Sequence, residues 1–116
     1  MRLVNRAAIT VTPKQPYIDW ANSLDDDGPR IEQDHLPERN VYLVADMGDY
    51  SVDTESVIKR YYRKIFEHEL NAWHRVESDW PQERDLAAFM QWFDAEVHSM
   101  VLDLLTRRIG TEPYEE

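Results

Sequence analysis

The side chains in this sequence that could bind a metal ion or transfer a proton are four histidines and many carboxylates. His68-Glu69 begins like the HExxH motif, which places two zinc-binding histidines one helical turn apart. Position 72 is Ala, however, and the next histidine is His74. Residues six positions apart do not share a face of a helix, so this stretch does not form that site. We interpret His68 as a partly buried structural residue at the margin of an apolar helix face.

A second group of such side chains lies near the C-terminus, where Asp94 and His98 stand four residues apart with Glu96 between them. On a helix, Asp94 and His98 would lie one turn apart and could share a metal ion or a proton, although such pairs also arise by chance. A small enzyme or metal protein using His68, Asp94, Glu96 and His98 is therefore an alternative hypothesis. Our main interpretation assigns no catalytic residue, no metal ligand and no cofactor.

Other catalytic patterns are missing from the sequence. None of its serines stands in a G-x-S-x-G setting, and its three glycines do not form a phosphate-binding loop. The absence of cysteine excludes disulfides, thiolate chemistry and cysteine-based zinc sites. The sequence therefore favours binding over catalysis.

The charge of the chain is strongly negative, with a formal net charge of −10, yet one dense basic cluster interrupts it. The cluster consists of Lys59, Arg60, Arg63 and Lys64. A solvated helix face is the plainer explanation, and a docking patch for an acidic partner or for a second copy of the chain is the functional one. The net charge disfavours binding to nucleic acid or to an anionic membrane.

Tryptophan is the other residue type that points to a binding surface. Trp73 fits the apolar face of a helix, whereas Trp20, Trp80 and Trp92 fall at helix ends, at an edge or in a loop. Core packing is the plainer explanation for each of the three. They could also line a groove or an interface, where tryptophan is enriched.

A polar loop supplies a further alternative. Its carboxylates could imitate the charge of a nucleic acid and occupy a basic groove, provided that they lie along one exposed face. The residues concerned are Asp25, Asp26, Asp27, Glu32, Asp34 and Glu38.

These side chains have to be positioned by a long amphipathic helix, which we predict over Val57–Trp73. Apolar residues recur there at three- and four-residue steps and form one broad stripe. The stripe contains Val57, Ile58, Tyr61, Tyr62, Ile65, Phe66, Leu70 and Trp73. Asp53 is placed to cap the helix, and Glu55 lies near its positive end.

Strands and shorter helices are predicted around this helix. A strand covers about 4–12, and a short helix follows over Tyr17–Leu24. Val41–Ala45 is a nearly unbroken apolar run, as expected of a strand that is central in a sheet or covered on both faces. Asp85 caps a helix whose stripe contains Leu86, Phe89, Met90, Phe93 and Val97. The stretch 99–105 fits a helix or a strand, and we favour a third strand.

The length of 116 residues suits one domain with one core. We predict a single α+β domain over residues 1–109, with a small two- or three-stranded sheet and helices packed on one face. Residues 110–116 form an acidic, frayed tail. No apolar run reaches the length of a membrane span, so we expect a soluble, cytoplasmic protein.

Three stretches together resemble short bacterial proteins of unknown function: 13–20 (PKQPYIDW), 40–44 (NVYLV) and 98–104 (HSMVLDL). The resemblance implies a bacterial source and no particular activity. From the charge pattern and the tryptophans, we expect a small acidic protein-binding or regulatory module. Its partner would be another protein or a second copy of the chain.

Overall fold

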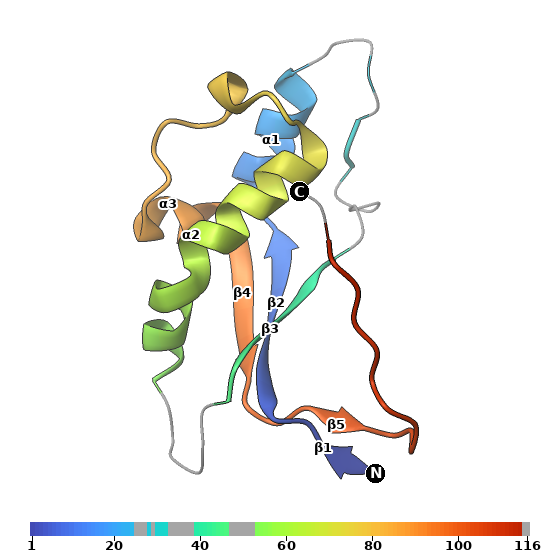
Figure 1. Ribbon diagram of the computed structural model, residues 1–116. Helices are drawn as coiled ribbons and strands as arrows, with labels where there is room; N and C mark the ends of the chain where they lie inside the picture. The colour runs from blue at the N-terminus through green and yellow to red at the C-terminus, as the bar shows by residue number, and fades with distance from the viewer. Residues whose placement is uncertain (25–27, 29, 33–38, 47–52, 115–116) are drawn as a thin grey trace.

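The computed structural model describes residues 1–24, 28, 30–32, 39–46 and 53–114, and it confirms an α+β architecture (Figure 1). Its helices pack on a small antiparallel sheet, as predicted. In chain order, the elements are β1 (Arg2–Leu3), β2 (Arg6–Pro13), α1 (Gln15–Ser23), β3 (Val41–Ala45), α2 (Thr54–Trp73), the 3-10 helix Glu77–Asp79, α3 (Leu86–Trp92), β4 (Phe93–His98) and β5 (Leu102–Asp103).

The central sheet has the strand order β3-β2-β4, with both neighbours antiparallel to β2. Side chains of β2 alternate between two faces of this sheet. Ala7, Ile9 and Val11 point to the face that the helices cover, and all three are buried. Thr10 and Thr12 point to the opposite face, which we call the outer face. The outer face also carries Asp94, Glu96 and His98 of β4, all of them exposed.

The long helix α2 forms because its apolar stripe meets this sheet and α3. Asp53 caps it through its side chain, which accepts a hydrogen bond from the backbone N–H of Glu55 at 3.1 Å. The stripe predicted from the sequence is confirmed, since its members Val57, Ile58, Ile65, Phe66 and Leu70 are buried. Trp73, at the end of the helix, is partly buried against the same core.

Aromatic rings fill the space between α2, α3 and β4. Phe66, Phe89 and Phe93 are fully buried. The ring centroid of Phe66 lies 5.8 Å from that of Phe89 and 5.4 Å from that of Phe93, both in edge-on arrangements. Such tilted pairs add to the stability that burial alone gives. This cluster fixes α2 relative to the sheet and thereby sets the distance between α2 and β3.

The prediction of a central or doubly covered strand at Val41–Ala45 is wrong. The bounds of the strand agree, but β3 lies at the edge of the sheet, and β2 is central. Val41 and Leu43 are 61% and 55% exposed. An apolar run does not distinguish an edge strand from a central one, because position in a sheet depends on pairing with distant segments.

The position predicted for the third strand is also wrong. Helix α3 ends at Trp92, and Phe93–His98 forms β4, which pairs with β2. Phe93, Ala95 and Val97 alternate inward along β4, although the same residues partly fit a helical stripe. Strand pairing with β2 therefore overrides the helical period. Leu102–Asp103 does form a short strand, β5, but its partner is β1 and not the central sheet.

The two chain ends reach different parts of the molecule. The N-terminal β1 pairs with β5 away from the helices, and the C-terminal segment then runs from β5 back towards α2 (Figure 1). Within the predicted tail, the ring of Tyr114 lies against that of His68, with centroids 5.4 Å apart. Among the described residues, no helix has the length and apolar character needed to cross a membrane.

Candidate functional site

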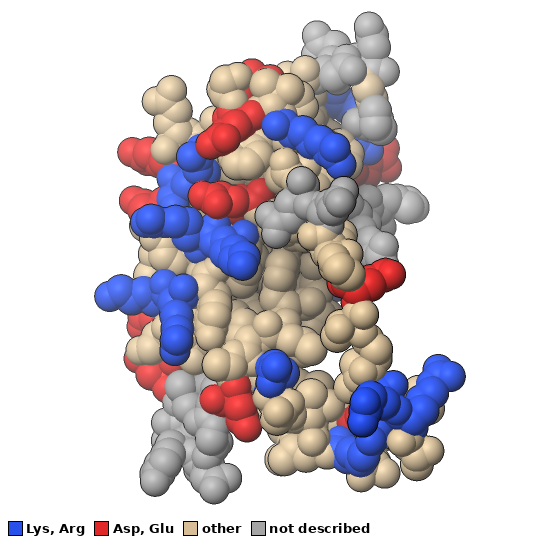
Figure 2. All heavy atoms as spheres, in the orientation of Figure 1, with Lys and Arg blue, Asp and Glu red and all other residues tan. Residues whose placement is uncertain are grey.

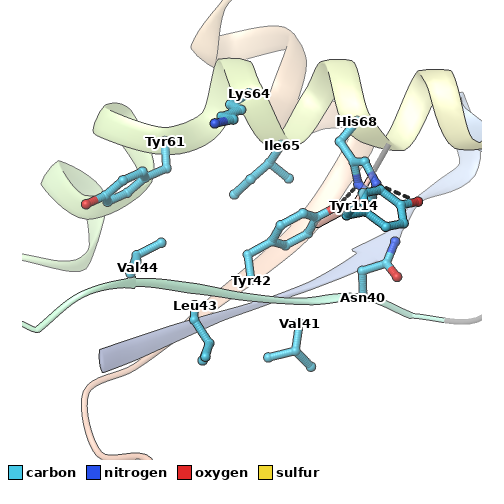
Figure 3. A pocket seen from close by; sticks show the side chains of 10 residues that line it. All are labelled: Asn40, Val41, Tyr42, Leu43, Val44, Tyr61, Lys64, Ile65, His68 and Tyr114. Atoms are coloured by element: carbon cyan, nitrogen blue, oxygen red, sulfur yellow. Dashed lines mark hydrogen bonds between the residues drawn. The ribbon is translucent and has the colours of Figure 1, made fainter. Parts of the chain in front are cut away.

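A groove lies between β3 and the side of α2 that faces it, and we call it the β3–α2 groove. Its volume is about 480 Å³. Strand β3 supplies one wall, and α2 supplies Tyr61, Lys64, Ile65 and His68 (Figure 3). Tyr114, from the C-terminal segment, closes one end. The groove thus has a wall of strand backbone, an apolar floor and a polar rim.

A chain of hydrogen bonds runs from the rim of this groove into the core. The Tyr42 hydroxyl donates to Glu69 Oε1 at 3.0 Å and lies 2.7 Å from His68 Nδ1. A hydroxyl carries one proton, so the Tyr42 oxygen accepts from the Nδ1–H of His68. In the neutral imidazole, that tautomer leaves Nε2 as an acceptor for the hydroxyl of Tyr114 at 3.3 Å. The protons of this network therefore point inward, towards Glu69.

Glu69 is the one charged residue among the buried residues that the structure describes, with 7% of its surface exposed. Burial raises the pKa of its carboxyl group, while hydrogen bonds from Tyr42 and Asn40 and the nearby His68 act in the opposite direction. Both oxygens of Glu69 lie 3.4 Å from the amide nitrogen of Asn40. Burial, together with the charge of Glu69, also raises the pKa of the Tyr42 hydroxyl. Glu69 thus anchors Tyr42 and, through it, the ring of His68.

The backbone of β3 is available on the side that faces the groove. Strand β2 occupies one edge of β3, and no other strand of the described residues joins the sheet at the second edge, which we call the open edge. At the end of the strand, the N–H of Ala45 points away from β2 and donates to the Tyr61 hydroxyl at 3.4 Å. Alternate residues of an antiparallel strand point their N–H groups the same way, so those of Val41 and Leu43 face the open edge.

The four basic residues predicted as a partner-binding patch all lie exposed on α2, where Lys and Arg side chains gather (Figure 2). Lys64 lines the groove. The guanidinium of Arg60 lies 5.6 Å from the ring centroid of Tyr61, another groove residue. Lys59 and Arg63 are not part of the lining. Of the basic cluster, Lys64 therefore lines the groove and Arg60 lies beside it.

The three tryptophans predicted as binding residues are partly buried against the core and lie apart from the groove. Trp20 and Trp92 contact each other, with ring centroids 6.0 Å apart. The indole N–H of Trp20 donates to the backbone oxygen of Asp79, and that of Trp80 donates to the backbone oxygen of His74. These hydrogen bonds tie the loop after α2 to the helices, so the three rings have packing roles.

The alternative catalytic set is not brought together. His68 lies on α2, on the helix-covered side of the sheet, whereas Asp94, Glu96 and His98 lie on the outer face. On that face, His98 Nε2 is 3.1 Å from the Thr10 hydroxyl and 3.8 Å from Glu96 Oε2. The described residues contain no group of three or more histidines and carboxylates that could hold a metal ion.

The acidic loop of the mimicry hypothesis lies largely outside the described residues. Asp25, Asp26, Asp27, Asp34 and Glu38 fall there, and only Glu32 is described, with an exposed side chain.

Sequence reasoning missed the network around Glu69, and one signal could have found it. Glu69 lies three residues after Phe66 and next to Leu70, inside the buried stripe of α2. A carboxylate at such a position requires a partner, because burial of an unpaired charge is costly. Its partners Asn40 and Tyr42, however, lie 29 and 27 positions away in the sequence, so the local pattern could not identify them.

The groove has to be interpreted from its own geometry, because the chain matches no protein-family model, no curated protein and no solved structure.

Proposed function

We propose that this chain is a small protein-binding module that holds an extended, acidic segment of a partner protein in the β3–α2 groove. The observation that carries the proposal is the open edge of β3, which forms one wall of the groove. A peptide that adds as a strand to such an edge gains main-chain hydrogen bonds, and pockets beside the edge select its side chains.

The backbone supports strand addition because the N–H groups of Val41 and Leu43 face the open edge. Their side chains point away from α2, whereas those of Tyr42 and Val44 point towards it (Figure 3). A peptide paired with β3 would therefore lie beside the strand and under α2. Alternate side chains of the peptide would contact Tyr61 and Ile65, which supply the apolar part of the groove.

The acidic character of the partner follows from the charges at the rim. Lys64 lines the groove, and Arg60 lies over the ring of Tyr61. Over the whole chain, the net charge is −10, so attraction to an acidic peptide has to act locally. Screening limits it to about 8 Å at physiological salt, which is the range of a side-chain contact.

The C-terminal segment of the chain itself places one side chain in the groove. Tyr114 closes one end of the groove and contacts His68. It belongs to the sequence Thr111-Glu112-Pro113-Tyr114-Glu115-Glu116, which is acidic. A tyrosine side chain is therefore compatible with this end of the groove. A partner with similar chemistry would extend further along β3.

Binding of synthetic peptides tests the proposal. We expect a fluorescent peptide of alternating valine and glutamate to bind, and one of alternating valine and lysine to bind at least about tenfold more weakly. Methylation of alternate backbone nitrogens of the acidic peptide should abolish binding, because it removes the hydrogen bonds of strand addition. Equal binding of the acidic and basic peptides, or indifference to methylation, would overturn the proposal.

Two charge reversals on the same helix provide a matched control. Lys64→Glu changes a residue that lines the groove, whereas Arg63→Glu makes the same change in charge at a neighbouring position outside the lining. We expect Lys64→Glu to weaken binding of the acidic peptide about three- to tenfold and Arg63→Glu to have little effect on its binding. Equal losses in the two variants would mean that only the overall charge matters and would exclude the groove as the site.

A further inference from the structure

A second surface, separate from the groove, has the properties of an interface. Residues 1–3 and 100–109, which we call the arm, contain β1 and β5 and extend away from the helices (Figure 1). Seven large apolar side chains of the arm are between 49% and 77% exposed: Met1, Leu3, Met100, Leu102, Leu104, Leu105 and Ile109. Exposed apolar residues concentrated in one place mark interaction sites, whereas scattered ones do not.

The contacts that hold the arm together are a short ladder and a few polar interactions, among them a hydrogen bond from Arg2 to the backbone oxygen of Arg107. Its ladder pairs Arg2 with Asp103 and Leu3 with Leu102, and a salt bridge of 3.1 Å joins the first pair. A two-stranded ribbon of this kind is marginal in water, even when it is longer. The radius of gyration of the chain is 16.0 Å, whereas a compact domain of this length has about 13 Å. These contacts leave the large apolar side chains of the arm exposed.

The outer face of the central sheet offers a matching surface on the same molecule. Val41 and Leu43 are exposed on it at the β3 side, and Asp94 and Glu96 are exposed on it at the β4 side. Between them, the face is hollowed into a shallow pocket of about 510 Å³, which Thr10 also lines. The outer face thus combines apolar and acidic side chains around a depression.

The charges of the two surfaces are complementary. Arg2, Arg107 and Arg108 are exposed on the arm, and basic side chains form a second cluster there, apart from α2 (Figure 2). Asp103 neutralises part of this charge through Arg2. On the outer face, Asp94 and Glu96 face solvent, with Arg39 at the margin of the pocket. A basic, apolar arm and an acidic, apolar face occur on one chain of net negative charge.

We propose that two copies of the chain associate by reciprocal exchange of arms, with the arm of each copy lying on the outer face of the other. Two complementary surfaces on one chain allow a closed two-fold dimer, in which each contact occurs twice. Burial of the apolar side chains would supply affinity, and the opposite charges would set the orientation. The outer face lies on the opposite side of the sheet from α2, so the exchange leaves the helix side of the β3–α2 groove accessible.

The oligomeric state of the full chain gives the first test. We expect a dimer in sedimentation experiments, with dissociation favoured by dilution and by high salt. Leu104→Asp, in the arm, should raise the dissociation constant of the dimer at least about tenfold. Val76→Asp is the matched control, because Val76 is 50% exposed and lies outside the arm and the outer face. A monomeric wild-type chain, or equal effects of the two substitutions, would overturn the proposal.

A charge-swap experiment identifies the two surfaces directly. One variant carries Arg107→Glu with Arg108→Glu, and the other carries Asp94→Arg with Glu96→Arg. Each variant should be monomeric alone, because its arm and its outer face then carry charge of the same sign and would repel each other at both contacts of the dimer. Mixed together, the variants should form a heterodimer, because the acidic arm of one fits the basic face of the other and the unaltered surfaces also match. Matched melting temperatures would show that all variants fold.

The remaining outcomes also decide the question. If the mixture stays monomeric, the arm and the outer face do not contact each other, and the proposal fails. If Arg60→Glu with Arg63→Glu abolishes the dimer, the interface lies on α2, and the exchange of arms is excluded. We expect that pair of substitutions to leave the dimer intact.

Discussion

Replacement of Tyr42 by Phe removes one hydroxyl and tests the network that supports the groove. In the wild-type chain this hydroxyl donates to Glu69 Oε1 at 3.0 Å and accepts from His68. Without this hydroxyl, the buried carboxylate still accepts hydrogen bonds from the amide nitrogen of Asn40, which lies 3.4 Å from each oxygen. The substitution changes little else, because the ring of Phe fills nearly the same space.

The expected loss of stability follows from the charge on Glu69. A hydrogen bond to a charged group contributes about 1.5–3 kcal/mol, and one between neutral groups contributes about 0.5–1.5 kcal/mol. We therefore expect Tyr42→Phe to lower the free energy of unfolding by about 2 kcal/mol where Glu69 is ionised. Where Glu69 is protonated, the expected loss is about 1 kcal/mol.

The loss should increase with pH. Burial raises the pKa of the Glu69 carboxyl group in the folded state. Protonation of Glu69 therefore contributes most to the free energy of unfolding below the pKa that this group has in the unfolded chain. That contribution is lost as the pH rises through the raised pKa. The Tyr42 hydroxyl opposes the shift, so its removal raises the pKa of Glu69 further. The free energy of unfolding of Tyr42→Phe should therefore fall more steeply with pH than that of the wild type.

Urea unfolding, followed by tryptophan fluorescence between about pH 5 and pH 8, measures this effect. Glu69→Gln and the double variant complete a thermodynamic cycle. In the Glu69→Gln background, loss of the hydroxyl should cost about 1 kcal/mol at every pH. At the upper end of the pH range it should cost about 2 kcal/mol in the wild-type background, so the coupling energy between Tyr42 and Glu69 there is about 1 kcal/mol. An equal cost of Tyr42→Phe in both backgrounds, unchanged by pH, would refute the role assigned to Glu69.

Two further predictions concern the elements that hold the groove in place. Phe66→Ala should cost about 3–5 kcal/mol, because Phe66 is fully buried among aromatic rings, whereas Lys64→Ala should change stability by under about 0.5 kcal/mol. Similar melting temperatures of the two variants would contradict the assigned helix faces. Asp85→Ala should cost about 1 kcal/mol, since Asp85 accepts from the Ala88 N–H at 2.8 Å at the start of α3. Asp85→Asn should retain most of that stability in the same thermal melts, and a loss as large as that of Ala would show that capping is not the cause.

Part of the candidate site was visible in the sequence. The exposure of Lys64 and the position of His68 at the margin of the apolar stripe both follow from helical periodicity, and both residues line the groove. The tryptophans were less informative, because an aromatic residue outside a clear stripe can still pack against the core from a neighbouring element. The pair of Tyr42 and Glu69 was not predicted, because their contact joins residues 27 positions apart.

Local sequence patterns were sufficient to predict some elements of this protein. The stripe and the Asp53 cap define α2, and the apolar run defines the bounds of β3, because these features depend on residues within a few positions of one another. Periodicity states which face of an element is buried, but it does not state which element covers that face. Tertiary contacts place β3 at an edge, make Phe93–His98 the third strand and bring Glu69 to Tyr42. These outcomes depend on pairings between distant segments, whose energies no local pattern records.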